Sequence, residues 1–295
     1  MTDAHGSDNM RAEVDMKDTE VRVAAVQLTS GADPAANLER AVALVRRAAG
    51  EGATYIQLPE YVNYRGPTKG YAAAAEAIPG PTTTRLAELA RAHGVTVHVG
   101  SVLERSSDPT KSYNTSVLIG PSGDVIATYR KAHLFDVNVP DQVEHHESRD
   151  IIAGEHLVVA EVAGFTLGLS VCFDVRFPEL YRQLALGGAT VLAVPSSFAV
   201  ATGRVHWEVL LRARAIENHA YVIAAAQAGT TTEGVSSYGH SMIVGPWGEV
   251  LAESDVDGED VLIATVDPQE VVRRRSQISV LELRRPDVYR SLPEA

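Results

Sequence analysis

Apolar stretches alternate with amphipathic stretches along the chain, and this alternation predicts strands followed by helices. Residues 21–29 and 54–58 are largely apolar, as expected of buried strands. Between them, residues 34–49 place apolar side chains at helical spacing along one face. A first series of elements is therefore expected at strand 21–29, helix 34–49, strand 54–58, helix 82–93 and strands 95–103, 112–119 and 124–130. A second series is expected at strand 165–171, helix 178–187, strand 190–195, helix 204–218 and strands 220–227, 239–244, 249–252 and 261–266.

The order strand-helix-strand-helix-strand-strand-strand thus occurs twice, and one stretch repeats in its residues as well. Residues 113–127 align without gaps on residues 238–252, with Tyr, Ser, Gly, Pro, Gly, Val and Ala at matching places. Each copy contains a Gly-Pro-x-Gly turn, which is typical of a hairpin. Two similar halves, each a sheet with helices on one face, can bury their sheets against each other. The sequence therefore predicts an α/β fold, a four-layer α-β-β-α sandwich built from two βαβαβββ halves.

The same pattern predicts one domain with short additions at both ends. Residues 1–19 are polar and aperiodic and are expected to form a disordered tail. The domain is expected to span residues 20–277, because no linker-like segment separates the two halves. Residues 278–295 keep several apolar side chains beyond the last core strand, and we expect this C-terminal arm to pack across the two-fold interface of a homodimer or higher homo-oligomer.

Composition narrows the classes of partner and compartment. The net charge of −12 argues against nucleic acid or an anionic membrane as the main partner. A single cysteine excludes an internal disulfide and makes the cytoplasm the expected compartment. No apolar stretch has the length of a membrane span. A small molecule is therefore the expected partner, and an anionic one would need a local cation.

Three side chains that could carry chemistry stand at the ends of predicted strands. Cys172 lies between a strand and a helix that starts at Pro178, while Glu60 and Lys131 each follow another strand. A thiol at such a turn faces the edge of the sheet where α/β proteins place their chemistry, and nearby N–H groups are expected to stabilise a thiolate and later an oxyanion. Taken singly, Cys172 could equally be a small buried apolar residue, Lys131 a structural ion-pair partner and Glu60 a solvated charge.

Three segments together point to a known family. They are Leu58-Pro-Glu60, Tyr129-Arg-Lys131-x-His133-Leu-Phe and Cys172-Phe-Asp174-x-Arg176-Phe-Pro178-Glu179. From about residue 20 to 290 the chain resembles the nitrilase or carbon–nitrogen hydrolase superfamily, and within it the branch of ω-amidases and deaminated-glutathione amidases. By this resemblance, helices 178–187 and 204–218 are expected to lie beside the C-terminal arm in the subunit interface.

The resemblance implies a Glu-Lys-Cys triad formed by Glu60, Lys131 and Cys172. In this interpretation Cys172 attacks the substrate and forms a thioester, and Glu60 shuttles protons. Lys131 and the backbone N–H of Phe173 stabilise the oxyanion. A second glutamate of the family corresponds to Glu147, which is expected to orient Lys131 and the substrate.

The resemblance also implies where the substrate binds. Arg176 matches an arginine that grips the substrate's carboxylate, and Phe198 and Thr202 match residues that line the same pocket. A scaffold role for Arg176, paired with Asp174 or Glu179, is the alternative.

We therefore predict an amidase that hydrolyses a small carboxylated linear amide, such as deaminated glutathione or an ω-amide, to an acid and ammonia. A nitrilase, an N-carbamoyl amino acid amidohydrolase, or a catalytically idle interaction module are the alternatives.

Neither a cofactor nor a metal is expected. Every group that the predicted reaction needs is a protein side chain or a backbone N–H. The spacing of His133, His145, His146 and His156 fits no compact zinc site, and no second cysteine is present.

Overall fold

Two six-stranded sheets form the centre of the molecule. The computed structural model describes residues 20–140 and 143–289. The first sheet has the strand order β16(Asp260–Val266), β1(Val21–Gln27), β2(Tyr55–Gln57), β3(Thr96–Arg105), β4(Ser112–Ile119) and β5(Val125–Arg130). The second has the order β15(Val250–Glu253), β14(Met242–Val244), β11(Tyr221–Ala224), β10(Val191–Ala193), β9(Phe165–Gly168) and β8(Val159–Val162). In each sheet three neighbouring strands are parallel and the outer ones are antiparallel.

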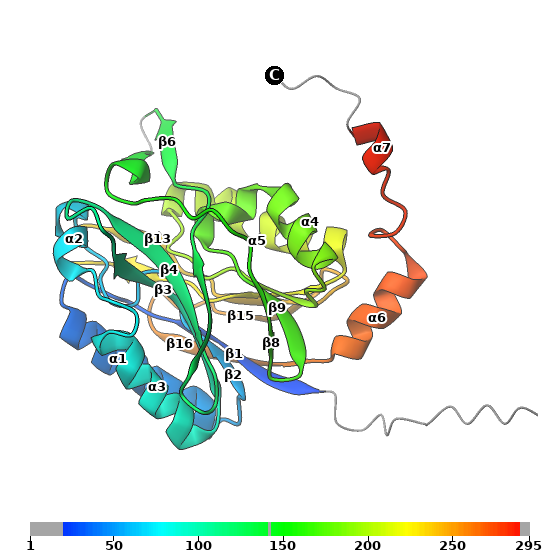
Figure 1. The fold of residues 1–295 in the computed structure, drawn as a ribbon, viewed down its shortest axis with the longest axis horizontal. Helices are drawn as coiled ribbons and strands as arrows, with labels where there is room; N and C mark the ends of the chain where they lie inside the picture. Colours follow the sequence, from blue (N-terminus) through cyan, green and yellow to red (C-terminus); the bar gives the residue numbers. More distant parts are fainter. Residues whose placement is uncertain (1–19, 141–142, 290–295) are drawn as a thin grey trace, which may run out of the picture.

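Helices cover the outer face of each sheet, so the predicted four-layer sandwich is confirmed. Figure 1 shows α1(Pro34–Gly50) and α3(Pro81–His93) on one side of the strands, and α4(Pro178–Leu186) and α5(Val200–Asn218) on the other. The main apolar cluster lies between the sheets and joins Tyr55 of the first to Phe165 of the second, with ring centres 5.4 Å apart. A polar contact also crosses this interface, because Gln57 Nε2 donates to the carbonyl of Ile223 at 2.8 Å.

Local signals in the sequence account for the starts of the helices. Pro34 is the first residue of α1, and the Asp33 side chain accepts from the N–H groups of Ala35 and Ala36. Pro178 begins α4, as predicted. Helix α5 begins at Val200, four residues earlier than predicted, because Gly203 and Thr202 fit its first turn despite their low helix propensity.

The internal repeat is confirmed by backbone geometry. The turns after β4 and β14 are matched: Gly123 has φ +83° and Gly248 has φ +87°, a region that favours glycine. Each N–H donates to the carbonyl of the first turn glycine, at 2.8 and 2.9 Å respectively. Both hairpins carry an irregularity in register at the equivalent position, before Ile119 and before Val244.

One strand pairs differently from the prediction. Strand 261–266 was expected to complete the second half, but as β16 it pairs antiparallel with β1 in the first sheet, from Val21↔Val266 to Gln27↔Asp260. Its place in the second sheet is taken by β8, which the sequence analysis did not predict and which forms a hairpin with β9. The chain therefore closes the first sheet with its last strand.

Several predicted strands are also shorter than expected. Strand 165–171 ends at Gly168, strand 220–227 at Ala224, and strand 239–244 begins at Met242. The residues between these ends and the predicted limits form loops around the candidate site. Elements that were not predicted are η1(Thr68–Gly70), α2(Tyr71–Ala74), β6(Asp136–Val139), β7(Val143–His146), η2(Glu147–Arg149), η3(Cys172–Arg176), β12(Ala228–Thr230), β13(Ser236–Tyr238), α6(Pro268–Gln277) and α7(Pro286–Tyr289).

The predicted N-terminal tail, residues 1–19, lies outside the described residues, as do residues 290–295 of the predicted arm. In Figure 1, α6 and α7 lead away from the two-sheet body. Within the described ranges, no helix is long and apolar enough to cross a membrane.

Candidate active site

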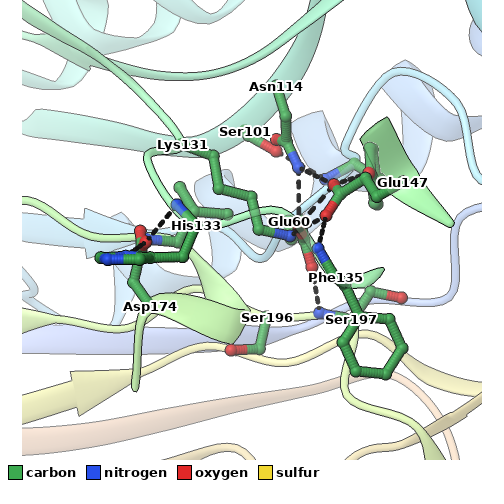
Figure 2. Close-up of polar contacts among 12 residues, drawn as sticks. Glu60, Ser101, Asn114, Lys131, His133, Phe135, Glu147, Asp174, Ser196 and Ser197 are labelled. Carbon is green, nitrogen blue, oxygen red and sulfur yellow. Dashed lines mark hydrogen bonds and ion pairs between the residues drawn. The ribbon is translucent and has the colours of Figure 1, made fainter. Parts of the chain in front are cut away.

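A buried lysine lies between two buried glutamates where the ends of strands from the first sheet meet loops of the second. Lys131 directly follows β5, Glu60 lies three residues beyond β2, and Glu147 opens η2. Lys131 Nζ is 3.0 Å from Glu60 Oε1 and 2.8 Å from Glu147 Oε2. All three residues are at most 2% exposed. Figure 2 shows the three side chains converging, and the structure thus brings together the residues that the sequence analysis predicted.

The two carboxylates keep this lysine charged despite its burial. Burial alone would lower the pKa of Lys131, but Glu147 and Glu60 outweigh that effect and hold the pKa well above its usual value. Burial likewise disfavours the charged form of Glu147, yet Lys131 and the hydrogen bonds to its carboxylate bring its pKa below 4.5. A buried cation of this kind is a fixed donor for an oxygen that becomes negative during a reaction.

Each glutamate is held by further donors. Ser197, in the loop after β10, donates its N–H to Glu60 Oε2 at 2.7 Å. The hydroxyl of Tyr61 donates to Glu147 Oε1 at 2.7 Å, and the N–H of Phe135 donates to Glu147 Oε2 at 2.6 Å. Glu60 is therefore anchored to both sheets, because Ser197 belongs to the second.

Asn114 belongs to the site, although the sequence analysis assigned it no role there. Its Nδ2 donates to Glu60 Oε1 at 2.8 Å and to Glu147 Oε1 at 3.3 Å. It lies on β4, whose neighbour β5 leads into Lys131, and its carbonyl accepts the Lys131 N–H at 2.9 Å. The signal available in the sequence was a buried-strand position occupied by an amide, which needs partners.

Cys172 opens η3 on a tight turn. Its φ is +49°, which is unusual for a residue with a side chain, and its N–H donates to the carbonyl of Pro195 at 2.9 Å. The thiol is 8% exposed. Burial and the neighbouring Glu60 carboxylate raise the pKa of Cys172 well above its usual value.

The resting thiol is therefore protonated, which corrects the expectation of a thiolate stabilised by N–H groups. The N–H of Ser197 and the charge of Lys131 do lower the pKa of Cys172, but the effects of burial and of Glu60 are larger. A base must take the proton at the moment of attack, and Glu60 is in contact with it.

A cavity of about 210 Å³ opens onto these groups. Predicted site residues that line it are Glu60, Lys131, Glu147, Cys172, Phe173, Phe198 and Thr202. Residues of the lining without a predicted role include Tyr61, Arg65 and His145.

Arg176 does not line the cavity but lies beside its aromatic wall. Its guanidinium carbon is 5.3 Å from the ring centre of Phe198 and 5.8 Å from that of Phe173. Its Nη1 is 3.3 Å from His206 Nδ1. Neither Asp174 nor Glu179 forms an ion pair with it in the described structure, so the alternative of a paired scaffold arginine finds no contact to support it.

Asp174 joins the cysteine turn to the lysine segment. One carboxylate oxygen accepts from the hydroxyl of Tyr129 and the N–H of Val171, both at 2.8 Å. The other accepts from the N–H of His133 at 3.0 Å and lies 2.7 Å from its Nδ1. Tyr129 and His133 flank Lys131, and Figure 2 shows the contact of Asp174 with His133 beside the site.

The histidines do not come together as a metal site. In the described part of the chain, no group of three or more His, Cys, Asp or Glu side chains could hold a metal ion. His133 contacts Asp174 and stacks on Phe177 at 3.7 Å, while His146 lies 3.3 Å from Glu144.

Comparison with known proteins identifies the family of this chain. A family model described as carbon-nitrogen hydrolase matches residues 22–276. The chain belongs to the carbon-nitrogen hydrolase family. The family resemblance read from the three sequence segments is thereby confirmed, and so is the assignment of the chain as a carbon–nitrogen hydrolase enzyme.

Individual relatives of this carbon-nitrogen hydrolase cover nearly its whole length. The chain is 39% identical to omega-amidase NIT2 of Danio rerio over 91% of its own length and 96% of the relative's. It is 41% identical to deaminated glutathione amidase of Synechocystis over 88% of the chain and 97% of the relative.

Solved structures agree in fold. Saccharomyces cerevisiae Nit3, a member of branch 10 of the nitrilase superfamily, superposes with a TM-score of 0.81 at 31% identity, over 91% of this chain and 97% of that one. An amidase from Nesterenkonia sp. AN1, whose active-site cysteine carries a covalently added acetamide moiety, superposes with a TM-score of 0.77 at 28% identity, over 92% and 97% of the two chains.

Proposed function

We propose that this carbon-nitrogen hydrolase cleaves the C–N bond of a small carboxylated linear amide through a thioester on Cys172. The observation that carries the proposal is the position of Glu60, which bonds Lys131 Nζ and the Ser197 N–H and lines the same cavity as the Cys172 thiol. A protonated nucleophile, a base in contact with it and a fixed cation are the groups that acyl transfer from an amide needs. The amidase names of the relatives support the same reaction. The adduct that fluoroacetamide forms on the active-site cysteine of the Nesterenkonia amidase mutant supports a nucleophilic role for the corresponding cysteine here.

The first half of the reaction forms the acyl-enzyme. Glu60 accepts the thiol proton as Cys172 Sγ bonds to the amide carbonyl carbon. Lys131 and the backbone N–H of Phe173 stabilise the oxyanion, and Glu147 holds Lys131 in place. Glu60 then returns the proton to the nitrogen, the C–N bond breaks, and ammonia or an amine leaves behind a thioester.

The second half releases the acid. Glu60 takes a proton from a water molecule, whose oxygen bonds to the thioester carbonyl carbon. The C–S bond breaks, Cys172 recovers its proton from Glu60, and the carboxylic acid departs. The overall reaction consumes one water per amide and needs no cofactor.

A carboxylate on the acyl side of the substrate is proposed to meet Arg176. The guanidinium is half-buried beside Phe198, has no carboxylate partner among the described residues, and lies four residues from Cys172. Phe198 and Thr202 line the cavity that Cys172 also lines. These features support an ω-amide of a dicarboxylic or keto acid, or deaminated glutathione, as the substrate class.

The test is turnover and trapping of the acyl-enzyme. The wild type is expected to release amine or ammonia from carboxylated amides, and less from the matching nitriles and N-carbamoyl amino acids. Cys172→Ala should abolish turnover while the melting temperature is retained. Because Cys172 is the one cysteine of the chain, acid quenching during turnover should give an intact mass larger by one acyl group in the wild type and no increase in Cys172→Ala. More than a few per cent of activity in Cys172→Ala would exclude the mechanism.

Assembly and location are part of the proposal. We propose a homodimer whose interface includes the C-terminal arm from residue 278 and helices α4 and α5. In support, Leu283 is 75% and Tyr289 60% exposed, although both are apolar or aromatic. A hollow of about 540 Å³ separates this arm from α4 of its own chain. The cytoplasm is the proposed compartment, since a single cysteine offers no internal disulfide.

A further inference from the structure

An arginine without a predicted role lies in the wall of the active-site cavity. Arg65 is five residues beyond Glu60 and lines the same cavity as Lys131 and Cys172. It is only 2% exposed, and no carboxylate of the described chain pairs with it. Burial lowers the pKa of Arg65 to about 10, so the side chain remains cationic at neutral pH. A buried cation without a counterion is costly unless a ligand supplies the negative charge.

The contacts of Arg65 fix the guanidinium and leave one donor free. Its two Nη atoms donate to five oxygens, all of them neutral: Ser30 O at 3.4 Å, Ala228 O at 3.2 Å, Gly229 O at 2.9 Å, Val235 O at 3.1 Å and Ser237 Oγ at 2.8 Å. Its Nε is buried and has no hydrogen-bond partner within the described residues. A buried donor is normally satisfied, so a free one at a cavity wall points to a ligand acceptor.

Arg65 and Arg176 come from different sheets. Arg65 lies in the segment after β2 of the first sheet, whereas Arg176 ends η3, which follows β9 of the second. Arg65 Nη2 donates to Ser237 Oγ, which lies 2.8 Å from Ser197 Oγ, and the Ser197 N–H in turn holds Glu60. Arg65 therefore lines the cavity on the side of Glu60, which protonates the leaving nitrogen, whereas Arg176 lies outside the cavity lining, beside Phe173 and Phe198.

A linear amide whose carbonyl meets Cys172 extends in two directions, with the acyl chain on one side and the amine on the other. If the acyl carboxylate meets Arg176, the guanidinium of Arg65, on the Glu60 side of the cavity, faces the amine half. We propose that Arg65 is a specificity-determining residue that binds a carboxylate on the amine half of the substrate. This inference rests on the proposed function and deepens it.

The substrate class that follows is a secondary amide with a carboxylate at each end. Its hydrolysis uses the same thioester: the C–N bond breaks, the nitrogen receives the proton held by Glu60, and the leaving group is an amino acid or short peptide instead of ammonia. Of the two classes of proposed substrate, this feature favours deaminated glutathione, whose amine half ends in a carboxylate, over a primary ω-amide.

The experiment compares three glutaric acid monoamides that differ only in the amine. Glutaramate releases ammonia, N-glutarylglycine releases glycine, and N-isobutylglutaramate releases an uncharged isostere of glycine. For the wild type, kcat/KM should be roughly 10- to 100-fold higher for the glycine amide than for the isobutyl amide, because a charged hydrogen bond is made to one alone. Arg65→Gln should bring this ratio close to one, and Arg65→Lys should recover part of it.

Arg275→Gln is the matched control. Its guanidinium also bonds backbone carbonyls, those of Ala189 at 2.7 Å and Asn218 at 3.3 Å, but it does not line the cavity. This variant should keep the wild-type ratio.

The outcomes separate this inference from the proposed function. A wild type that hydrolyses none of the three amides contradicts the proposed function. A wild type that hydrolyses the glycine and isobutyl amides equally well overturns the role of Arg65 alone, whether or not the variants fold. If folded Arg65→Gln lost kcat/KM by the same factor for all three amides, Arg65 would only support the loop at 228–237, and the inference would be overturned.

Discussion

At the scale of single residues, the site depends on how burial and charge compete at one ammonium group. Lys131 is removed from water and yet has a raised pKa, because two carboxylates within 3.0 Å outweigh the effect of burial. At Cys172 the two effects do not compete: burial and the Glu60 carboxylate both raise the pKa of the thiol, so the resting thiol is protonated. The resting cavity therefore holds its charge on Lys131 and the glutamates while the nucleophile stays neutral.

Glu147→Gln tests the contribution of this charge pair to stability. Since the pKa of Glu147 is lowered by folding, its stabilising contribution is fully present above pH 4.5, the usual value, and is lost as pH falls through the lower folded value. Removing one partner of a buried pair costs about 3–5 kcal/mol, and the lower end is expected because Glu60 remains.

The measurement is the difference in free energy of unfolding between wild type and Glu147→Gln from pH 7 to pH 3. The difference should be constant above about pH 4.5 and shrink below it. Glu144→Gln, an exposed neighbour on β7, is the control and should show no such trend. A difference that grows on acidification would contradict the assignment.

Which site residues the sequence could reveal depends on where they stand. Glu60, Lys131 and Cys172 lie just beyond strand ends within recognisable segments, so their convergence could be predicted. The roles of Asn114 and Arg65 could not be predicted, because they depend on contacts with residues that are far away in the sequence. Asn114 acts through the β4–β5 register, and Arg65 through the loop at 228–237.

At the scale of elements, the turn that carries the nucleophile is tied to the segment that carries the cation. Asp174 is fully buried in η3 and accepts from groups on both sides of Lys131 and from the residue before Cys172. Two elements from different sheets are thus held at a fixed separation by one carboxylate. Such positioning matters because a displacement of about 1 Å between reacting groups can cost on the order of 100-fold in rate.

Asp174→Asn is expected to lower kcat by at least about 10-fold and to change KM much less. The Asn amide group has one acceptor oxygen and one donor nitrogen, and that nitrogen must face groups that donate to Asp174 in the wild type. Hydrogen bonds between the cysteine turn and the lysine segment are lost, so the distance between Cys172 and Lys131 is no longer fixed. The rate at which iodoacetamide alkylates Cys172 should change as well, which a general loss of stability would not produce in the folded enzyme. Asp33→Asn, at the N-cap of α1, is the control and should leave both rates unchanged. Wild-type kcat in Asp174→Asn would refute the positioning role.

Elements were predictable where the pattern was long and local. Helix α1 and the hairpins β4–β5 and β14–β15 have clear periodicity or turn glycines, and they lie where expected. Strand β8 has only four residues, three of them apolar, which is too short a run to show an alternation, and β16 resembles any buried strand. Hydrophobic periodicity identifies a strand but does not say which strand it pairs with. The pairing of β16 with β1 could therefore not be predicted from the sequence pattern.

At the scale of the whole molecule, apolar side chains remain exposed on one outer helix and on the C-terminal arm. On α5, Val205 and Val209 are 64% and 66% exposed and are one helical turn apart. Leu283 of the arm is 75% exposed. Such surfaces are typical of contacts between subunits, and the proposed homodimer would cover both.

Val209→Glu should convert the proposed dimer to a monomer by placing a charge in its interface. Light scattering at micromolar concentration is expected to give twice the mass of one chain for the wild type and the mass of one chain for the variant. Val256→Glu, at an exposed valine outside α5 and the arm, should remain dimeric. A monomeric wild type would rule out the homodimer.

The pairing of β16 with β1 also bears on how the chain is made. A ribosome releases β1 among the first residues of the domain and β16 among the last, yet the seven residues of β1 depend on β16 for the hydrogen bonds along one edge. Until translation has passed Val266, the nascent first sheet keeps that edge open, and an open edge invites pairing with other chains. The first sheet therefore cannot be completed before β16 has emerged from the ribosome, by which time every strand of the second sheet has emerged as well.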